Sequence, residues 1–256
     1  MYDLLLNQAK ILQQLSGMWI ITLLVFSRVL AFASMAPLIG HKSIPALIKI
    51  SFSMLLTLII LPNLQVPEIY PKDFQFVYLI VINVMVGLFI GWVAHLVLEI
   101  GRTAGEMVDM QMGLNAATIF DPGTQTQSTI IGRFFDALTL TLFVSIGGME
   151  KIIEGLYKSF NAFPIIMYEF NISFDKLLKA TTDVIAIGFL IVSPIVITIL
   201  AVDLILGLMS RAAPQINAFQ ISFSIKPSVG LLLLMMLLPA LFQVLSSLFS
   251  NPNRFF

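Results

Sequence analysis

Four charged residues lie at helical spacing, at offsets of 0, 3, 7 and 10, beside an apolar stretch of the sequence: Glu99, Arg102, Glu106 and Asp109. In a helix Arg102 can pair with Glu99, three residues before it, and with Glu106, four residues after it. Ionisable side chains within a membrane segment either form structural pairs or carry ions and protons. We predict a structural ion-pair ladder. The alternative is a small ion-coupled secondary transporter, in which Glu106 and Asp109 carry protons opposite Arg102.

The sequence lacks the residue patterns that enzymes and metal sites use. Its two histidines, His41 and His95, are 54 positions apart, and it has no cysteine. It contains no H-E-x-x-H zinc motif, no G-x-S-x-G nucleophile turn, no Walker loop and no dinucleotide-binding glycine motif. We therefore expect a protein that is not an enzyme and that binds neither a metal nor a cofactor.

Composition assigns the chain to the integral membrane proteins. Hydrophobic residues make up 58% of the 256 residues and charged residues only 11%, against about 25% charged residues in soluble domains. So few charges could not cover the surface of a water-soluble fold. The formal net charge is zero and the basic residues are scattered, so the sequence offers no binding surface for nucleic acid.

Runs without charge predict the helices that position these residues. The clearest run, 74–98, is long enough to cross about 30 Å of hydrocarbon, and the others are 11–27, 50–67, 184–202 and 227–253. Ala-Phe-Ala at 31–33 imitates a signal-peptide cleavage site, but Asp3 and Arg28 argue against cleavage, so we expect a retained first helix. No linker or soluble domain separates the runs. We expect one all-α membrane domain over residues 1–256.

A second face of the helix that begins at 74 carries small residues in register: Gly87, Gly91, Gly101 and Gly105. They form two G-x-x-x-G pairs, which allow another helix backbone to approach closely. We predict close packing on this face, either against a helix of the same chain or at a contact between subunits. A helix over 74–112 would be about 58 Å long, so it either breaks or extends beyond the hydrocarbon.

The next segment, 113–128, is small, polar and nearly uncharged. Asp121, Pro122 and Gly123 fit a turn with proline and glycine at its centre. Non-helical backbone persists at membrane depth only where protein or a water-filled cavity covers it. An ordinary solvent loop is the alternative.

Two arginines stand out elsewhere. Pro214 is predicted to end the helix that carries Asp203 and Gly207, and Arg211 lies in its last turn, where a cation suits the helix dipole. Arg28 lies inside an apolar helix, so its charge needs a partner or a route to the membrane surface.

Three ordered motifs resemble the family of the flagellar biosynthesis protein FliR. They are R-T-A-G-E-M-V-D-M-Q-M-G-L-N-A-A-T-I-F-D-P at 102–122, G-G at 147–148 followed by S-F at 159–160 and Pro164, and G-L-M-S-R-A-A-P-Q-I-N-A-F at 207–219. Together they extend the resemblance over essentially the whole chain. Met149 follows the G-G pair where the family usually has a histidine, which suggests that this histidine is not needed for export.

The resemblance implies an architecture, partners and a location. In this family, helical hairpins with long kinked helices wind around a central pore in a helical multi-subunit assembly. One copy joins several FliP and FliQ subunits, and FlhB wraps the cytoplasmic side, in the bacterial inner membrane at the flagellar basal body. The implied function is a non-enzymatic pore subunit of the type III export gate, through which unfolded flagellar substrates pass. A membrane scaffold without a conduit ranks below it and below the transporter.

The resemblance also assigns positions. The loop that follows the family's long helix plugs the closed pore and corresponds here to 113–128, so the expected pore-closing residues are Gly113, Leu114, Asn115, Ile119, Phe120, Asp121, Pro122 and Gly123. The second family motif contributes Arg211, Pro214, Gln215 and Asn217.

Overall fold

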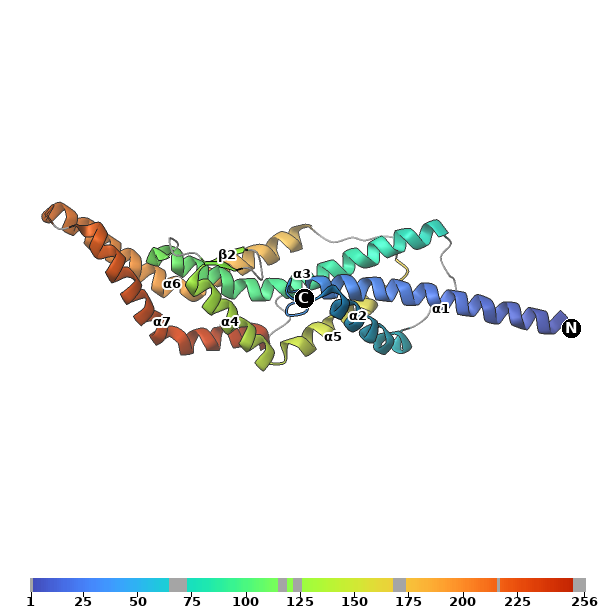
Figure 1. Ribbon diagram of the computed structural model, residues 1–256. Helices are drawn as coiled ribbons and strands as arrows, with labels where there is room; N and C mark the ends of the chain where they lie inside the picture. The colour runs from blue at the N-terminus through green and yellow to red at the C-terminus, as the bar shows by residue number, and fades with distance from the viewer. Residues whose placement is uncertain are drawn as a thin grey trace. The chain divides into compact units, whose positions relative to one another are not determined.

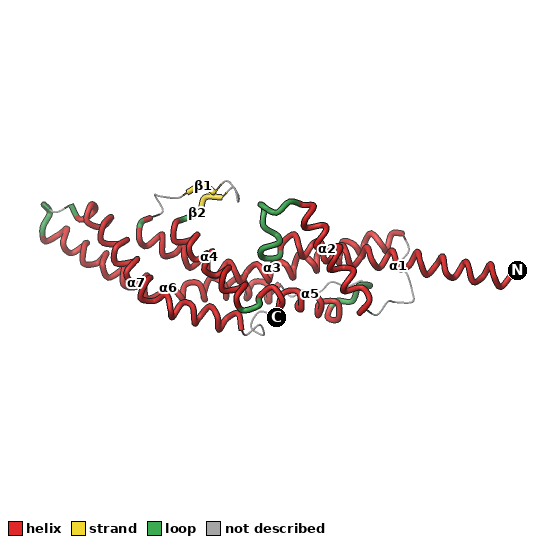
Figure 2. Tube along the Cα trace, turned by 60° about the horizontal axis from the view of Figure 1, so that its bottom comes forward, coloured by secondary structure: helices red, strands yellow, loops and turns green. Residues whose placement is uncertain are grey.

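The structure is a computed structural model that describes residues 2–64, 73–114, 119–121, 126–167, 174–215 and 217–250. Most of these residues are helical (Figures 1 and 2). In chain order the elements are α1 (Tyr2–Met35), α2 (Ala46–Ile60), the short 3-10 helix η1 (Leu61–Asn63), α3 (Asp73–Met112), β1 (Ile119–Asp121), β2 (Thr126–Ser128), α4 (Ile130–Ser145), α5 (Gly148–Ala162), α6 (Phe174–Ala212) and α7 (Ala218–Ser250). The predicted all-α class is confirmed, and the described residues add one short hairpin of two strands.

Among the described residues, five stretches of helix are long and apolar enough to cross a membrane. They are Gly17–Met35, Ala46–Asn63, Phe74–Met112, Thr181–Ala212 and Ala218–Ala240, and α4 with α5 makes a sixth if the two are counted as one broken span. Each of the five charge-free runs of the sequence overlaps one of these stretches, and 74–98 and 184–202 lie wholly within theirs. The helices do not stop where the runs stop, because the polar residues at their ends are still compatible with helical backbone.

Helix α3 continues through the charged residues without a break. Its 40 residues correspond to about 60 Å at 1.5 Å per residue, twice the thickness of the hydrocarbon layer. One helix therefore carries both the glycine face and the charged face that the sequence places on it.

Two compact units divide the chain. The first comprises Met1–His95 and Glu150–Ile172, and the second comprises Leu96–Met149 and Ser173–Phe256. Helix α3 contributes its first part to one unit and its last part to the other. Each unit therefore combines segments that lie far apart in the sequence.

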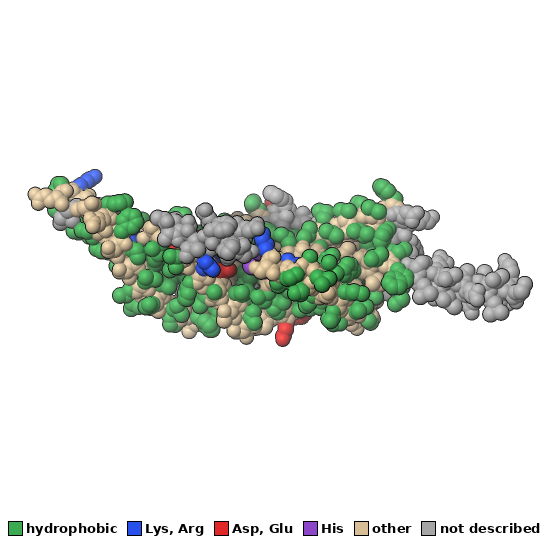
Figure 3. All heavy atoms as spheres, in the orientation of Figure 1, with side chains coloured by type: hydrophobic (Ala, Val, Ile, Leu, Met, Phe, Trp, Pro, Cys, Tyr) green, Lys and Arg blue, Asp and Glu red, His purple; other side chains and the backbone are tan. Residues whose placement is uncertain are grey.

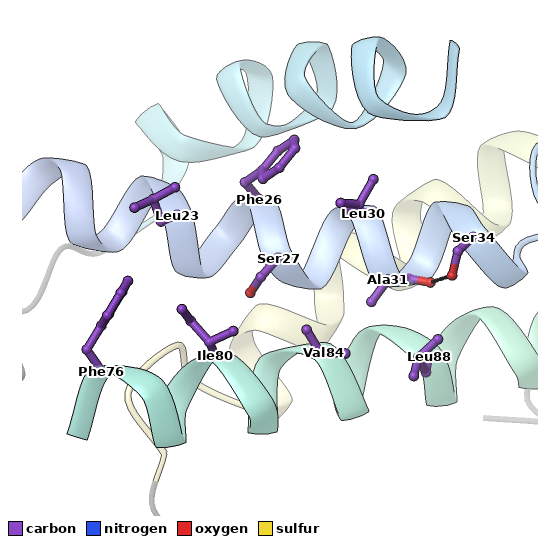
Figure 4. A pocket seen from close by; sticks show the side chains of 10 residues that line it. All are labelled: Leu23, Phe26, Ser27, Leu30, Ala31, Ser34, Phe76, Ile80, Val84 and Leu88. Atoms are coloured by element: carbon purple, nitrogen blue, oxygen red, sulfur yellow. Dashed lines mark hydrogen bonds between the residues drawn. The ribbon is translucent and has the colours of Figure 1, made fainter. Parts of the chain in front are cut away.

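In the first unit, α1 and α3 lie side by side (Figure 4). Buried apolar side chains of α1, including Leu24 and Phe32, and of α3, including Leu79 and Val86, form its core. The same two helices border a shallow apolar groove of about 440 Å³, lined for example by Phe26 and Leu30 of α1 and by Ile80 and Val84 of α3. The hydroxyl of Ser34 in this groove donates to the carbonyl of Ala31 at 2.6 Å, so it is already satisfied.

In the second unit, α6 and α7 lie against each other as a helical hairpin (Figures 1 and 2). Proline occurs inside both helices, at Pro194 in α6 and at Pro227 and Pro239 in α7. Because proline removes a backbone hydrogen bond, these positions bend a helix, and α7 changes direction along its length (Figure 1). An ion pair between Lys226 and Asp203 joins the two helices.

Hydrophobic side chains dominate the surface shown in Figure 3, with charged groups in a few places. Large apolar side chains are exposed on several helices, for example Leu47 on α2, Leu204 on α6 and Met235 on α7. Exposed apolar area of this extent is typical of a surface that contacts lipid or other proteins.

Candidate functional site

The candidate site is the polar segment between α3 and α4, residues 113–128, which we call the closing segment. Helix α3 ends at Met112, and Gly113 follows with a positive φ of 76°, a conformation that glycine adopts without strain. Ile119, Phe120 and Asp121 form β1, which pairs antiparallel with β2 in the register Ile119↔Ser128, Phe120↔Gln127 and Asp121↔Thr126. Three expected pore-closing residues, Asn115, Pro122 and Gly123, lie outside the described residues.

The return of the chain into α4 is fixed by two acceptors on one backbone amide. The N–H of Gly132 donates to Oγ1 of Thr129 at 3.2 Å and to Oδ2 of Asp109 at 2.9 Å. Thr129 is the N-cap residue of α4, whereas Asp109 reaches across from α3. Asp109 is fully buried, and its Oδ1 has no hydrogen-bond partner in the part of the chain that the structure describes.

Two glycines of α3 allow α4 to pack closely against it. A Cβ atom built on Gly105 would lie 2.7 Å from Cα of Gly132 and 2.9 Å from the carbonyl oxygen of Ile131. A Cβ atom on Gly101 would overlap the side chain of Thr139. Because both contacts are shorter than van der Waals distance, any larger residue would force the helices apart.

The other two glycines of the same face contact α1 in the first unit. A Cβ atom on Gly87 would overlap the carbonyl oxygen of Arg28, and one on Gly91 would lie 2.8 Å from that of Phe32. All four glycines are thus covered by helices of this chain. A contact between subunits at these positions would require this packing to open.

The structure brings together three of the four charged residues of α3. Nε of Arg102 lies 3.0 Å from Oε1 of Glu106, and its Nη1 lies 3.8 Å from Oε1 of Glu99. All three side chains are about one-third to one-half exposed. Asp109 instead binds the amide of Gly132.

The second family motif lies at the turn between α6 and α7. Helix α6 ends at Ala212, with Arg211 exposed in its last turn, and Pro214 and Gln215 are exposed beyond it. Oδ1 of Asn217 accepts a hydrogen bond from the N–H of Gln220 at 3.2 Å. Asn217 therefore caps the N-terminus of α7, a role that an asparagine directly before an apolar helix could have indicated.

The G-G motif has a local explanation. Gly147 follows α4 with a positive φ of 72°, and a Cβ atom on Gly148 would overlap the side chain of Phe143. Both positions thus require glycine to join α4 to α5. Met149 is half-buried at the start of α5.

Arg28 is a charged residue for which the sequence predicts no specific partner. Its guanidinium is fully buried in α1 of the first unit. It donates to Oδ1 of Asn83 at 3.0 Å and to the carbonyl oxygens of Ser159, Phe163 and Pro164 at 3.3, 2.8 and 3.5 Å. The guanidinium also lies 4.4 Å from the ring centre of Phe160. The backbone partners are carbonyls at and just beyond the negative end of the α5 dipole.

Comparison with known proteins gives a consistent result. The family described as bacterial export proteins, family 1, matches residues 19–251. The flagellar biosynthetic protein FliR of Bacillus subtilis is 30% identical over 232 residues, 89% of this chain and 90% of that protein. The FliR protein of Escherichia coli is 32% identical over 225 residues, 88% and 86% of the two chains. That of Aquifex aeolicus is 27% identical over 236 residues, 91% of each.

Proposed function

Because the chain belongs to family 1 of the bacterial export proteins and is a membrane-associated component of flagellar protein export, we propose that it is a pore-forming structural subunit of the type III export gate. In this proposal it helps to build the conduit for unfolded flagellar substrates, and the closing segment seals that conduit at rest. The chain performs no catalytic step, since other components drive the movement of substrates.

The observation that carries the proposal is the position of the closing segment. It contains the two strands of the described chain, in a protein whose other described elements are helices, and it lies between the ends of α3 and α4. Most of its residues are small or polar, and Asp121 is its one charged residue. A non-helical segment of this kind needs a covered or water-filled position at membrane depth, which the mouth of a pore provides.

The exposed helical surfaces support assembly with other subunits. Only 11% of an 18-residue window within the apolar stretch Ala218–Ala240 of α7 is buried, and only 22% of the 18 residues Ala46–Asn63. These faces must be covered by lipid or by protein. We propose FliP-type, FliQ-type and FlhB-type subunits as the protein partners and the bacterial inner membrane at the flagellar basal body as the location.

One observation favours the alternative of an ion-coupled secondary transporter. Asp109 is buried within a candidate membrane span, and its Oδ1 has no partner among the described residues. However, its Oδ2 binds a backbone amide, and Arg102 holds Glu106 at the half-exposed side of the helix. The two carboxyl groups therefore have separate structural partners.

Deletion of residues 118–125 tests the proposal. We expect the variant to assemble with its partner subunits and the purified complex to conduct ions at rest in a planar lipid bilayer, because the seal is missing. A control variant replaces the same eight residues with glycine and serine, which separates loss of length from loss of side chains. A deletion complex that stays as tight as the parent would place the seal elsewhere.

A further inference from the structure

We infer that Asp109 is the positioning residue that holds the closing segment at its base, by fixing the start of α4 to the last turns of α3. This inference rests on the proposed function of the closing segment as the seal. In this inference, the side chain of Asp109 keeps β2, the strand that leads into α4, in place.

The contact of Asp109 connects the two ends of the closing segment. The chain leaves α3 at Gly113, four residues after Asp109, and enters α4 at Ile130, two residues before Gly132. The hydrogen bond between Asp109 and Gly132 spans 23 residues and so joins the two ends of the excursion. It adds a polar contact to the close packing of Gly105 on Gly132, and it opposes the separation of the two ends that the entropy of a long loop favours.

The local cap cannot replace this contact. Thr129 accepts from the same N–H as Asp109, but Thr129 belongs to the segment that enters α4, so its bond moves with α4. Asp109 belongs to α3, and its bond therefore resists movement of α4 against α3. The two acceptors share one donor. Thr129 fixes the first turn of α4, whereas Asp109 fixes α4 to α3.

The residues around Asp109 are buried and closely packed, which favours a contact of fixed geometry. Asp109 is fully buried, and its neighbours Val108, Met112 and Ile131 are buried as well. A Cβ atom on Gly132 would overlap Oγ1 of Thr129, and one on Gly105 would lie 2.7 Å from Cα of Gly132. A carboxyl oxygen also suits the positive end of the α4 dipole.

The test compares two variants that each remove one acceptor from the Gly132 amide. Asp109→Leu removes the contact to α3, and Thr129→Val removes only the local cap. In the assembled complex we expect Asp109→Leu to raise the resting ion conductance by roughly tenfold, which corresponds to the loss of one hydrogen bond of this class. We expect Thr129→Val to stay near the parent value. A third variant, Asp109→Ser, is too short to reach Gly132 and should behave like Asp109→Leu.

Equal conductance of Asp109→Leu and Thr129→Val, with the 118–125 deletion leaking, would overturn the inference and leave the proposed function standing. A tight deletion complex would instead refute the proposed function. Hydrogen exchange at the Gly132 amide then tests the inference. The inference requires faster exchange of this amide in Asp109→Leu than in Thr129→Val. Equal exchange rates in the two variants would contradict it. If neither Asp109 variant assembles while Thr129→Val does, Asp109 serves the fold and the inference is wrong.

Discussion

Arg28 in α1 and Asn83 in α3 are joined by a hydrogen bond from Nε to Oδ1 at 3.0 Å, although 55 residues separate them. Both side chains are fully buried. Nδ2 of Asn83 in turn donates to the carbonyl oxygen of Ile165 at 3.0 Å. Together with the bonds of Arg28 to Ser159, Phe163 and Pro164, the pair satisfies four carbonyls at and beyond the end of α5. Among the described residues, amide and carbonyl oxygens rather than a carboxylate thus stabilise this buried cation.

Replacing Arg28 should destabilise the protein. Arg28→Leu removes the guanidinium donors of Asn83 and of the carbonyls at and beyond the end of α5, and we expect a loss of about 2–4 kcal/mol of unfolding free energy. Arg28→Lys keeps the charge but lacks the planar fork, so it should recover only part of the loss. Thermal unfolding in detergent measures both. Equal stability of Arg28→Leu and the parent would contradict the role of this cluster.

Substitution of Gly101 should disrupt packing within the chain. Gly101→Leu places a side chain on Thr139 and should cost several kcal/mol by overpacking, with loss of assembly and export. Gly207→Leu is the matched control for stability, because among the described residues nothing lies within 4 Å of a Cβ atom at Gly207; Gly207 belongs to the second family motif, so only the unfolding free energy of this variant is compared. Co-purification with partner subunits and an export assay report the outcome. Normal assembly of Gly101→Leu would show that the α3–α4 contact is not required.

Charge changes on α3 distinguish a structural ion-pair ladder from an ion-coupled transporter. Reversal at Arg102 places three acids together on one helix face, and we expect about 1 kcal/mol of destabilisation, since the pairs are partly exposed. Glu106→Gln should leave export measurable at every proton-motive force. Complete loss of export in Glu106→Gln, with the complex intact, would favour the ion-coupled transporter instead.

The ion pair between Asp203 and Lys226 should hold α6 and α7 in register. Asp203→Asn and Lys226→Met should each destabilise the helical hairpin, and the exchanged pair Asp203→Lys with Lys226→Asp should recover part of the loss. We expect a coupling energy of about 1 kcal/mol from a double-mutant cycle. Strictly additive effects would show that the two side chains do not interact.

The sequence predicted the helical class, and the structure confirms this class, because apolar runs determine which segments enter a membrane. Partners were harder to predict. Helical spacing alone put Asp109 beside Arg102, but the amide of Gly132 comes from another helix. The carbonyl partners of Arg28 likewise come from a distant segment. Because every residue has a backbone carbonyl, the sequence does not indicate which carbonyls bind Arg28. The glycine face was recognised from spacing, yet only the structure shows that α1 and α4 cover it.

The division of the first unit between Met1–His95 and Glu150–Ile172 has a consequence for synthesis. The carbonyl of Ser159 follows Arg28 by 131 residues, so at about 5–20 residues per second the ribosome supplies it on the order of ten seconds later. During that interval α1 carries a guanidinium without its α5 partners. We therefore expect α1 to reach its final position in the membrane only after α5 has been synthesised.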